Sequence, residues 1–214
     1  MVCGSRAPKC VTRTQILSGN ASFPQDYHRT AAQVNPGPPR SREQTGCENI
    51  QRVAGLHYRT IDSPIGPLTL AGYGSTLSVL CMAEQRHEPD RSGWRPAGGG
   101  AFAPVVEQLA AYFAGELTRF DVEVDLAGTT FQRRVWAALV TIPYGETRSY
   151  GQIAEQIGSP GAARAVGSAN GRNPVSIIVP CHRVIGSSGG LIGYGGGLDR
   201  KRTLLALERA REWP

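Results

Sequence analysis

Residues 180–184 read PCHRV, so a thiol, an imidazole and a guanidinium follow one another along the chain. The preceding run, Val175 to Val179, is almost entirely apolar, which predicts a short buried strand that ends just before Cys181. A thiolate, rather than a thiol, attacks electrophiles, and a neighbouring histidine or cationic group promotes its formation. Cys181 is therefore a candidate nucleophile, and the His182 ring is near enough in sequence to reach its sulfur directly or through a water molecule.

A histidine that acts as a base needs an acceptor that fixes its orientation. We expect Glu208 to fill this role, because it lies in the predicted helix KRTLLALERA, residues 201–210, whose leucines indicate inward packing. A partly buried carboxylate would hold the imidazole of His182 in one tautomer and stabilise its charged form. Taken alone, however, a Cys–His pair more often marks an inert buried cysteine beside a surface histidine.

Residues 57–128 predict a small α/β unit that positions no catalytic group of its own. Three segments, HYRTID, GPLTLAGYG and TLSVLCMAE, alternate or run apolar between turn signals, as in an antiparallel meander. Residues 88–100 are predicted to be a loop, residues 102–116 a helix, and residues 120–126 a further strand. Cys81 lies within an apolar strand, which is typical of a packing residue.

Residues 129–214 predict a second, mainly helical unit. TTFQRRVWAALVTIP is predicted to be a helix with a threonine cap. SYGQIAEQI and AARAVGSANG are two short helices joined by a glycine-containing turn, which makes a helix-turn-helix candidate. The second short helix carries small side chains around a single long one, Arg164; the small residues are Ala162, Ala163, Ala165, Gly167, Ser168 and Ala169. Such a helix can approach another helix or a nucleic acid closely, and the lone arginine favours nucleic acid.

Charge is distributed unevenly along the chain. The net charge is +6, and residues 131–202 hold nine Lys/Arg against three Asp/Glu, whereas residues 57–130 hold five against nine. A basic second half indicates a surface for a polyanion such as nucleic acid. A solvated basic face without any partner would have the same composition.

Residues 1–56 are predicted to be an unstructured extension, because Pro, Ser, Arg and Gln dominate and no apolar periodicity lasts. Three of the five cysteines, Cys3, Cys10 and Cys47, lie there without a C-x2-C pair, so no metal site is expected. The odd number of irregularly spaced cysteines predicts a reducing, cytoplasmic environment. No apolar stretch approaches the length of about 20 residues that a membrane helix needs, and no secretory signal is recognisable.

Five motifs occur in one order and together resemble a known family. They are IPYGETRSYGQIA, AARAVG, NPVSIIVPCHRVIG, GYGGGLDRK and LLALE. They resemble the O6-alkylguanine-DNA alkyltransferases, the suicide DNA-repair proteins, and among these the single-domain bacterial Ogt-type members, over about residues 57–210. The resemblance implies an α+β fold: a small α/β, ribonuclease-H-like domain with antiparallel strands (57–128), then a mainly helical, winged-helix-like domain (129–214) with the helix-turn-helix and the active-site cysteine.

The resemblance also implies what the protein does. It is expected to transfer the alkyl group of O6-methylguanine, and also of O4-methylthymine, in double-stranded DNA to Cys181, once and irreversibly, as a monomer without a cofactor. His182 would be the water-mediated base and Glu208 its partner. Because the lesion lies inside the duplex, the nucleotide must flip out, and Arg164 matches the arginine that fills the vacated place in the stack.

Further positions match family residues that bind DNA or enclose the flipped base. Tyr150 matches the tyrosine that crowds the 3′ phosphate and donates to the lesion, and Asn173 matches the asparagine that stabilises the turn before the active-site strand. Four small residues of the second helix are expected at the minor groove: Ala162, Ala163, Gly167 and Ala169. The lesion pocket is implied to consist of Tyr194, Gly195, Gly196, Gly197 and the backbone carbonyl groups of Cys181 and Val184.

The chain departs from some family members at one position, where Gly195 stands in place of a serine that can assist the lesion oxygen. Fewer donors and a more flexible loop are expected here, with better tolerance of bulky O6 substituents.

Three other functions stay open. One is a non-catalytic protein that binds alkylated DNA on the same scaffold, which the presence of Cys181 disfavours. Another is a cysteine hydrolase that uses Cys181 and His182, which would leave the helix-turn-helix and Arg164 without a role. The third is a DNA-binding regulator with an incidental cysteine.

Overall fold

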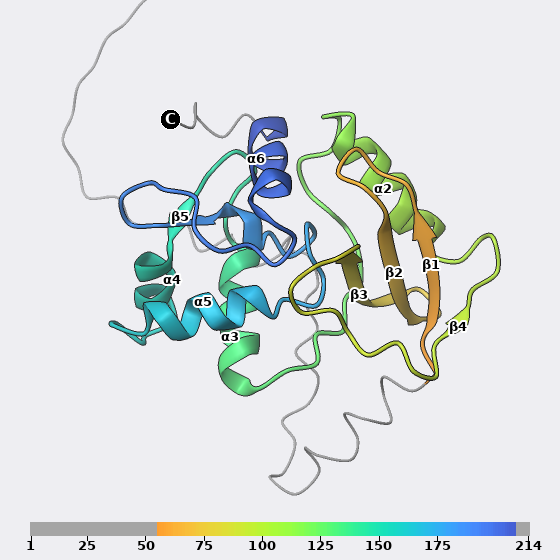
Figure 1. The fold of residues 1–214 in the computed structure, drawn as a ribbon, viewed down its shortest axis with the longest axis horizontal. Helices are drawn as coiled ribbons and strands as arrows, with labels where there is room; N and C mark the ends of the chain where they lie inside the picture. The colour runs from red at the N-terminus through yellow and green to blue at the C-terminus, as the bar shows by residue number, and fades with distance from the viewer. Residues whose placement is uncertain (1–54, 209–214) are drawn as a thin grey trace, which may run out of the picture.

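The computed structural model describes residues 55–208, which form two units that pack side by side (Figure 1). The first unit holds a four-stranded sheet and one helix, and the second holds the remaining helices with a two-stranded sheet. The predicted α+β fold class is confirmed. The predicted extension lies outside the described residues except for Gly55 and Leu56, and so do Cys3, Cys10 and Cys47.

The sheet of the first unit is an antiparallel meander with one added parallel edge strand. β1 (His57–Ile61), β2 (Leu68–Tyr73) and β3 (Thr76–Met82) pair in succession as predicted. β4 (Arg95–Pro96) pairs in parallel with β1, which gives the order β3-β2-β1-β4. The prediction that residues 88–100 are all loop was therefore wrong at Arg95–Pro96. The backbone N–H groups of Arg95 and Ala97 donate to Leu56 O and Tyr58 O at the edge of β1.

The two faces of this sheet bury different sets of side chains, because successive residues of a strand point to opposite sides. One face packs against helix α2 (Ala103–Phe113) in the main core that both units share. The other face holds Ala71, Val79 and Cys81 beneath Trp94 in a smaller cluster. Cys81 is thus a buried free thiol among apolar side chains, as predicted.

The predicted strand at residues 120–126 is wrong, because only Val124 pairs, in a single bridge to Leu77. Leu77 N donates to Glu123 O, and Asp125 N donates to Leu77 O, each at 2.9 Å. The alternating apolar residues are nevertheless all buried. The alternation of apolar and polar residues correctly indicated which side of the segment faces the core. The segment nevertheless pairs with the sheet at a single residue.

The second unit begins with α3 (Thr130–Val140), followed by α4 (Tyr150–Gln156) and α5 (Ala163–Gly171), which make the predicted helix-turn-helix. The first two helices start with a capping box, in which a hydroxyl and a glutamine three residues later satisfy each other's backbone N–H groups. Thr129 with Gln132 caps α3, and Ser149 with Gln152 caps α4.

The rest of the second unit consists of two short strands and the last helix. β5 (Arg148–Ser149) pairs in parallel with β6 (Val184–Ile185), which sequence reasoning missed because each strand is two residues long. α6 (Leu198–Leu207) begins three residues before the predicted start, and Glu208 is its C-terminal cap. Between residues 55 and 208, no helix is long and apolar enough to cross a membrane.

Candidate active site

The segment that carries Cys181 is held by both units. Leu80 of β3 pairs with its beginning, since Leu80 N donates to Pro174 O at 2.9 Å and Ser176 N donates to Leu80 O at 3.0 Å. Its end, Val184, pairs with Arg148 of β5. Figure 1 shows this segment where the two units meet. The thiol is therefore fixed relative to the sheet on one side and the helices on the other.

The predicted buried strand before Cys181 is wrong, because Val175–Val179 folds into a tight turn. Ile177 adopts a left-handed backbone conformation, with φ of 71°, and Val179 N donates back to Val175 O at 3.0 Å. The Asn173 side chain closes this turn: its Nδ2 donates to Val179 O at 2.7 Å, and its Oδ1 accepts from Val175 N at 3.0 Å. Cys181 then opens a short 3-10 helix, Cys181–Arg183.

The Cys181 thiol is enclosed, with 4% of the residue exposed. Burial raises the pKa of this thiol, and side-chain hydrogen bonds from Asn173 and Ser176 and the nearby charge of Lys201 oppose that effect. The net direction is upward from an ordinary value of 9.0, so the sulfur is a protonated thiol at neutral pH. It needs a base to become a nucleophile.

His182 is placed to be that base. Its Nε2 lies 2.9 Å from Glu208 Oε1, and both side chains are fully buried. Since a carboxylate only accepts, Nε2 carries the proton and Nδ1 keeps its lone pair. Burial lowers the pKa of His182, so the ring is neutral, and Nδ1 is buried with no hydrogen-bond partner in the described part of the chain. An unpaired nitrogen of this kind suits a water that links it to the thiol.

Glu208 accepts from three residues. Arg183 donates from Nε to Oε2 at 2.8 Å and from Nη2 to Oε1 at 2.9 Å, and Tyr112 of α2 donates to Oε1 at 2.7 Å. Burial alone would raise the pKa of the Glu208 carboxyl, but the hydrogen bonds from His182 and Arg183 hold it well below its usual range. Glu208 is thus an ionised, fully partnered carboxylate, as its predicted role requires.

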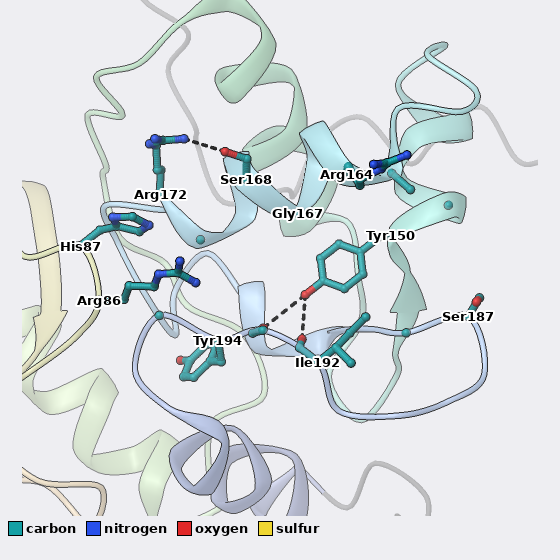
Figure 2. A pocket seen from close by; sticks show the side chains of 16 residues that line it. Arg86, His87, Tyr150, Arg164, Gly167, Ser168, Arg172, Ser187, Ile192 and Tyr194 are labelled. Carbon is teal, nitrogen blue, oxygen red and sulfur yellow. Dashed lines mark hydrogen bonds between the residues drawn. The ribbon is translucent and has the colours of Figure 1, made fainter.

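A pocket of about 730 Å³ opens beside this segment, between α5 and the loop at residues 186–195. Figure 2 shows Tyr150 pointing across it to that loop, where its hydroxyl donates to Ile192 O at 3.0 Å and Gly193 O at 3.3 Å. Arg164 lies exposed at one side of the pocket, and Arg86 and His87 of the first unit lie at another. The pocket therefore has a cationic rim built from both units.

Tyr194 separates the pocket from Cys181. Tyr194 lines the pocket, while its hydroxyl is buried next to Cys181. Burial, and the nearby Cys181, raise the pKa of Tyr194 well above its ordinary value. Cys181 itself does not line the pocket, so this loop stands between the open space and the thiol.

The structure brings most of the predicted site residues together. Tyr150, Ala163, Arg164, Gly167, Tyr194 and Gly195 line the pocket. Ala162 is partly exposed at the start of α5, and Gly196 lies in the same loop against Met82. Ala169 was wrongly predicted to contact DNA, because its side chain is 3% exposed and its carbonyl accepts from Trp136 Nε1 at 2.9 Å.

The two backbone carbonyl groups that were expected to bind the base already have partners. Cys181 O accepts from Asn170 Nδ2 at 3.2 Å and from Val184 N, so a bound base would share or replace one of these donors. Val184 O accepts from Lys201 Nζ at 2.6 Å. That these two carbonyl groups bind the base stays a prediction.

Sequence reasoning missed four side chains of the site. Arg183 stands inside the PCHRV motif, and Tyr112 lies on the apolar face of the predicted helix at 102–116, where it looked like a core residue. Lys201 is fully buried, and its ammonium donates to Val184 O, Ile192 O and Gly193 O. Arg200 connects the loop to the first unit by donating to Ile65 O, Ala83 O and Gly196 O.

No group of His, Cys, Asp and Glu side chains that could hold a metal ion occurs within the described range.

Two family models together match almost all of the described chain. The model described as "6-O-methylguanine DNA methyltransferase, DNA binding domain" matches residues 130–210, and "6-O-methylguanine DNA methyltransferase, ribonuclease-like domain" matches residues 56–126. Among curated relatives, the methylated-DNA–protein-cysteine methyltransferase of Mycobacterium tuberculosis is 72% identical over 73% of this chain and 94% of its own. That of Methanosarcina acetivorans is 50% identical over 72% of this chain and 98% of its own.

Solved structures agree with this similarity. The crystal structure of Mycobacterium tuberculosis OGT in complex with DNA is 71% identical and covers 73% of this chain and 95% of its own, with a TM-score of 0.70. The crystal structure of Mycobacterium tuberculosis O6-methylguanine methyltransferase is also 71% identical, with a TM-score of 0.68.

Proposed function

The chain belongs to the 6-O-methylguanine DNA methyltransferase family, whose members repair DNA by alkyl transfer, and we propose that Cys181 is its alkyl acceptor. The observation that carries this proposal is the enclosed Cys181 thiol beside a neutral histidine whose outer nitrogen is held by a buried carboxylate. DNA is the partner. Within double-stranded DNA, the proposed substrates are O6-methylguanine and, second, O4-methylthymine.

The base must leave the duplex before the thiol can reach its alkyl carbon. α5 is the part of the surface suited to the minor groove, since Ala162, Ala163 and Gly167 let a backbone approach closely. Arg164 is exposed beside the pocket, where its side chain can occupy the space that a flipped nucleotide leaves. Because Tyr194 lines the pocket and its side chain lies near Cys181, we expect the loop at 192–197 to shift when the base enters.

The transfer needs one proton to leave the sulfur and one to reach the departing base. The thiol proton passes through water to His182 Nδ1, and Glu208 stabilises the imidazolium that forms. The bond from sulfur to the alkyl carbon forms as the bond from that carbon to O6 breaks. Burial raises the pKa of Tyr150 to about 12, so its hydroxyl stays protonated and donates a hydrogen bond to the leaving guanine oxygen. The guanine takes up one proton from solvent, and the imidazolium returns the thiol proton to solvent, so that His182 and Tyr150 end in the forms in which they began.

The product on Cys181 is a thioether, which has no ready hydrolytic exit. One molecule therefore removes one alkyl group and is then inactive, and no cofactor takes part. We further propose that the chain acts as a cytoplasmic monomer with domain boundaries at 57–128 and 129–214. The free state of the two described cysteines, Cys81 and Cys181, supports the reducing compartment.

Intact-protein mass after incubation with a duplex that contains O6-methylguanine tests this function. We expect a single added methylene mass, which peptide mapping places on Cys181. Cys181→Ser should gain no mass while binding the same duplex with nearly unchanged affinity, because the serine replaces one buried atom away from the pocket surface.

The same experiment separates the alternatives. Binding of the methylated duplex without any adduct would identify a non-catalytic DNA-binding protein and refute the proposal. Repeated turnover of an ester or amide substrate, with no lasting adduct, would instead identify a cysteine hydrolase. An adduct on Cys81 and none on Cys181 would overturn the assignment of the acceptor.

A further inference from the structure

The hydroxyl of Tyr112 joins the first unit to the His182–Glu208 pair. Tyr112 lies on α2, 96 residues before Glu208, and its Oη donates to Glu208 Oε1 at 2.7 Å. Both residues are enclosed, with exposures of 0% and 1%. The other donors to this carboxylate, His182 and Arg183, come from the helical unit. A tyrosine of the ribonuclease-like domain thus reaches into the proton path of the helical one.

Three donors share a single oxygen of Glu208. Oε1 accepts from Tyr112 Oη, His182 Nε2 and Arg183 Nη2, while Oε2 accepts from Arg183 Nε alone. Hydrogen bonds to an ionised acceptor are strong and sensitive to geometry. The position of Oε1 and the charge that it presents to His182 therefore depend on how many donors compete for it.

The ring of Tyr112 and its hydroxyl have separable roles. The ring packs against Phe113, Phe120 and Tyr144, with centroids 5.4, 5.2 and 6.2 Å away. A phenylalanine would keep all three contacts. The hydroxyl makes its hydrogen bond to the carboxylate, and burial, followed by the charge of Glu208, raises the pKa of Tyr112 far above its ordinary value. It is a permanent donor and never a base.

We propose that Tyr112 is a positioning residue for alkyl transfer, whose hydroxyl holds Glu208 Oε1 against His182 Nε2 so that Nδ1 remains the free acceptor for the Cys181 proton. The proposal rests on the function given above, since it concerns the same proton transfer. It gives the ribonuclease-like domain a direct part in the reaction, in addition to its contribution to the core.

The proposal predicts the direction in which the pH dependence should move. Among residues 55–208, the charged and titratable groups around Glu208 are Tyr112 from α2, His182 and Arg183 from the 3-10 helix, and Tyr144 from the segment after α3; Lys201 from α6 acts on His182. Loss of the Tyr112 hydroxyl leaves the full carboxylate charge to His182 and Arg183. The protonated form of His182 is then favoured, so the acid side of the rate profile moves to higher pH.

The test is the first-order rate of methyl transfer in the complex with saturating methylated duplex, measured from pH 5.5 to pH 9, a span of about 3.5 units around the ordinary pKa of histidine. Tyr112→Phe should slow transfer about tenfold near pH 7, the effect of one strong charge-assisted hydrogen bond. The midpoint of the acid limb in the pH–rate profile of Tyr112→Phe should lie about half a pH unit above that of the wild type. Affinity for DNA should stay unchanged, because Tyr112 has no exposed surface.

Tyr144→Phe is the matched control. It removes another hydroxyl from the same aromatic cluster, one that donates to the backbone at Leu207 O, and it keeps the ring beside Arg183. If Tyr112 had only a structural role, Tyr112→Phe would lower the melting temperature and leave the acid limb of the pH–rate profile in place. We expect that result for Tyr144→Phe. In a Glu208→Gln background, Tyr112→Phe should have no further effect on the rate.

Site-specific replacement of Tyr112 by 3-fluorotyrosine covers the case in which Tyr112→Phe does not fold. The fluorinated phenol keeps the shape and is a stronger donor, so the acid limb should move to lower pH, opposite to the shift expected for phenylalanine. An acid limb that stays fixed in every folded Tyr112 variant overturns the proposal. If the wild-type protein itself gains no methyl group on Cys181, the proposed function fails instead, and the two failures are distinguishable.

Discussion

Tyr150 and Lys201 donate to the same two backbone carbonyl groups, those of Ile192 and Gly193. Tyr150 reaches them from α4 at the pocket surface, and Lys201 reaches them from α6 in the interior. The loop over Cys181 is therefore held from two sides. In the proposed reaction Tyr150 turns to donate to the lesion, and the Lys201 ammonium would still hold both carbonyl groups, so the loop would keep an anchor.

Lys201→Met is expected to loosen this loop more than Tyr150→Phe. Methionine matches the length of lysine but removes a buried donor from three carbonyl groups, including Val184 O, whereas Tyr150→Phe leaves Lys201 in place. Hydrogen–deuterium exchange of peptides that cover residues 186–197 measures the difference. Equal exchange in the two variants would contradict the assignment of Lys201 as the inner anchor.

Arg164→Ala should impair repair of a duplex much more than reaction with a free O6-alkylguanine base. The arginine lies exposed at the side of the pocket and touches no group of the Cys181–His182–Glu208 set. Its removal therefore affects extrusion of the nucleotide and leaves the chemistry intact. Rates of Cys181 alkylation by the two substrates provide the comparison, and similar losses on both would remove Arg164 from the flipping step.

The contribution of Glu208 to the free energy of unfolding should be lost at acidic pH. Its folded pKa lies well below the ordinary 4.5, so the unfolded chain binds a proton at this site that the folded chain does not. The stabilisation is complete above pH 4.5 and falls with decreasing pH by up to about 1.4 kcal/mol per unit. Urea unfolding of wild type and Glu208→Gln should show a stability difference that is largest near pH 7 and shrinks below pH 4.5.

The size of that difference near neutral pH follows from the buried partner. Glu208→Gln leaves the Arg183 guanidinium enclosed without a counter-charge, which costs about 3–5 kcal/mol for a broken buried pair. A difference that is constant from pH 7 to pH 3 would show that the carboxylate is not the ionised group described above.

Neighbouring glycines of the loop should respond differently to substitution. A Cβ on Gly195 would meet only Gly171 O, at 3.6 Å, so Gly195→Ser fits, whereas a Cβ on Gly196 would collide with the Met82 sulfur. We expect Gly195→Ser to fold normally and to discriminate more strongly against O6-benzylguanine relative to O6-methylguanine. Unchanged discrimination by this variant would contradict the expected effect of the missing serine.

Gly196→Ala is the contrasting change in the same loop. Its methyl group has no space beside Met82 and Tyr194, so the buried Met82 side chain or the loop must shift. A lowered melting temperature and slower transfer of even the methyl group are expected. Calorimetry and the same alkylation assay measure both effects, and wild-type behaviour of Gly196→Ala would show that the close approach to Met82 is dispensable.

Local signals in the sequence predicted the elements that are long or capped. The helices α2, α3, α4 and α5 and the three-strand meander follow from apolar spacing, capping residues and turn signals, each contained within a few residues. The elements that were missed or wrong depend on distant partners. β4, β5 and β6 are two residues long and exist because another segment lies beside them, and Val175–Val179 turns because Asn173 and Leu80 bind its backbone.

The candidate site divides in the same way. Cys181, His182 and Glu208 were found because a reactive thiol needs a base and the base needs an acceptor, and because the motifs resemble a known family. Tyr112 and Lys201 were missed because a tyrosine on an apolar helix face and a lysine in a basic helix are ordinary in sequence. Only the fold shows that both side chains end inside the protein, one on a carboxylate and the other on three carbonyl groups.

The enclosure of Cys181 also governs what the protein does while no lesion is present. A thiolate attacks peroxides and disulfides that reach it, and this sulfur is neither ionised nor accessible at rest. If Cys181 is consumed only once, as proposed, this enclosure spares it from side reactions in solution. Under the proposed function, the Cys181 thiol would stay reduced and unalkylated until a flipped nucleobase displaces the loop.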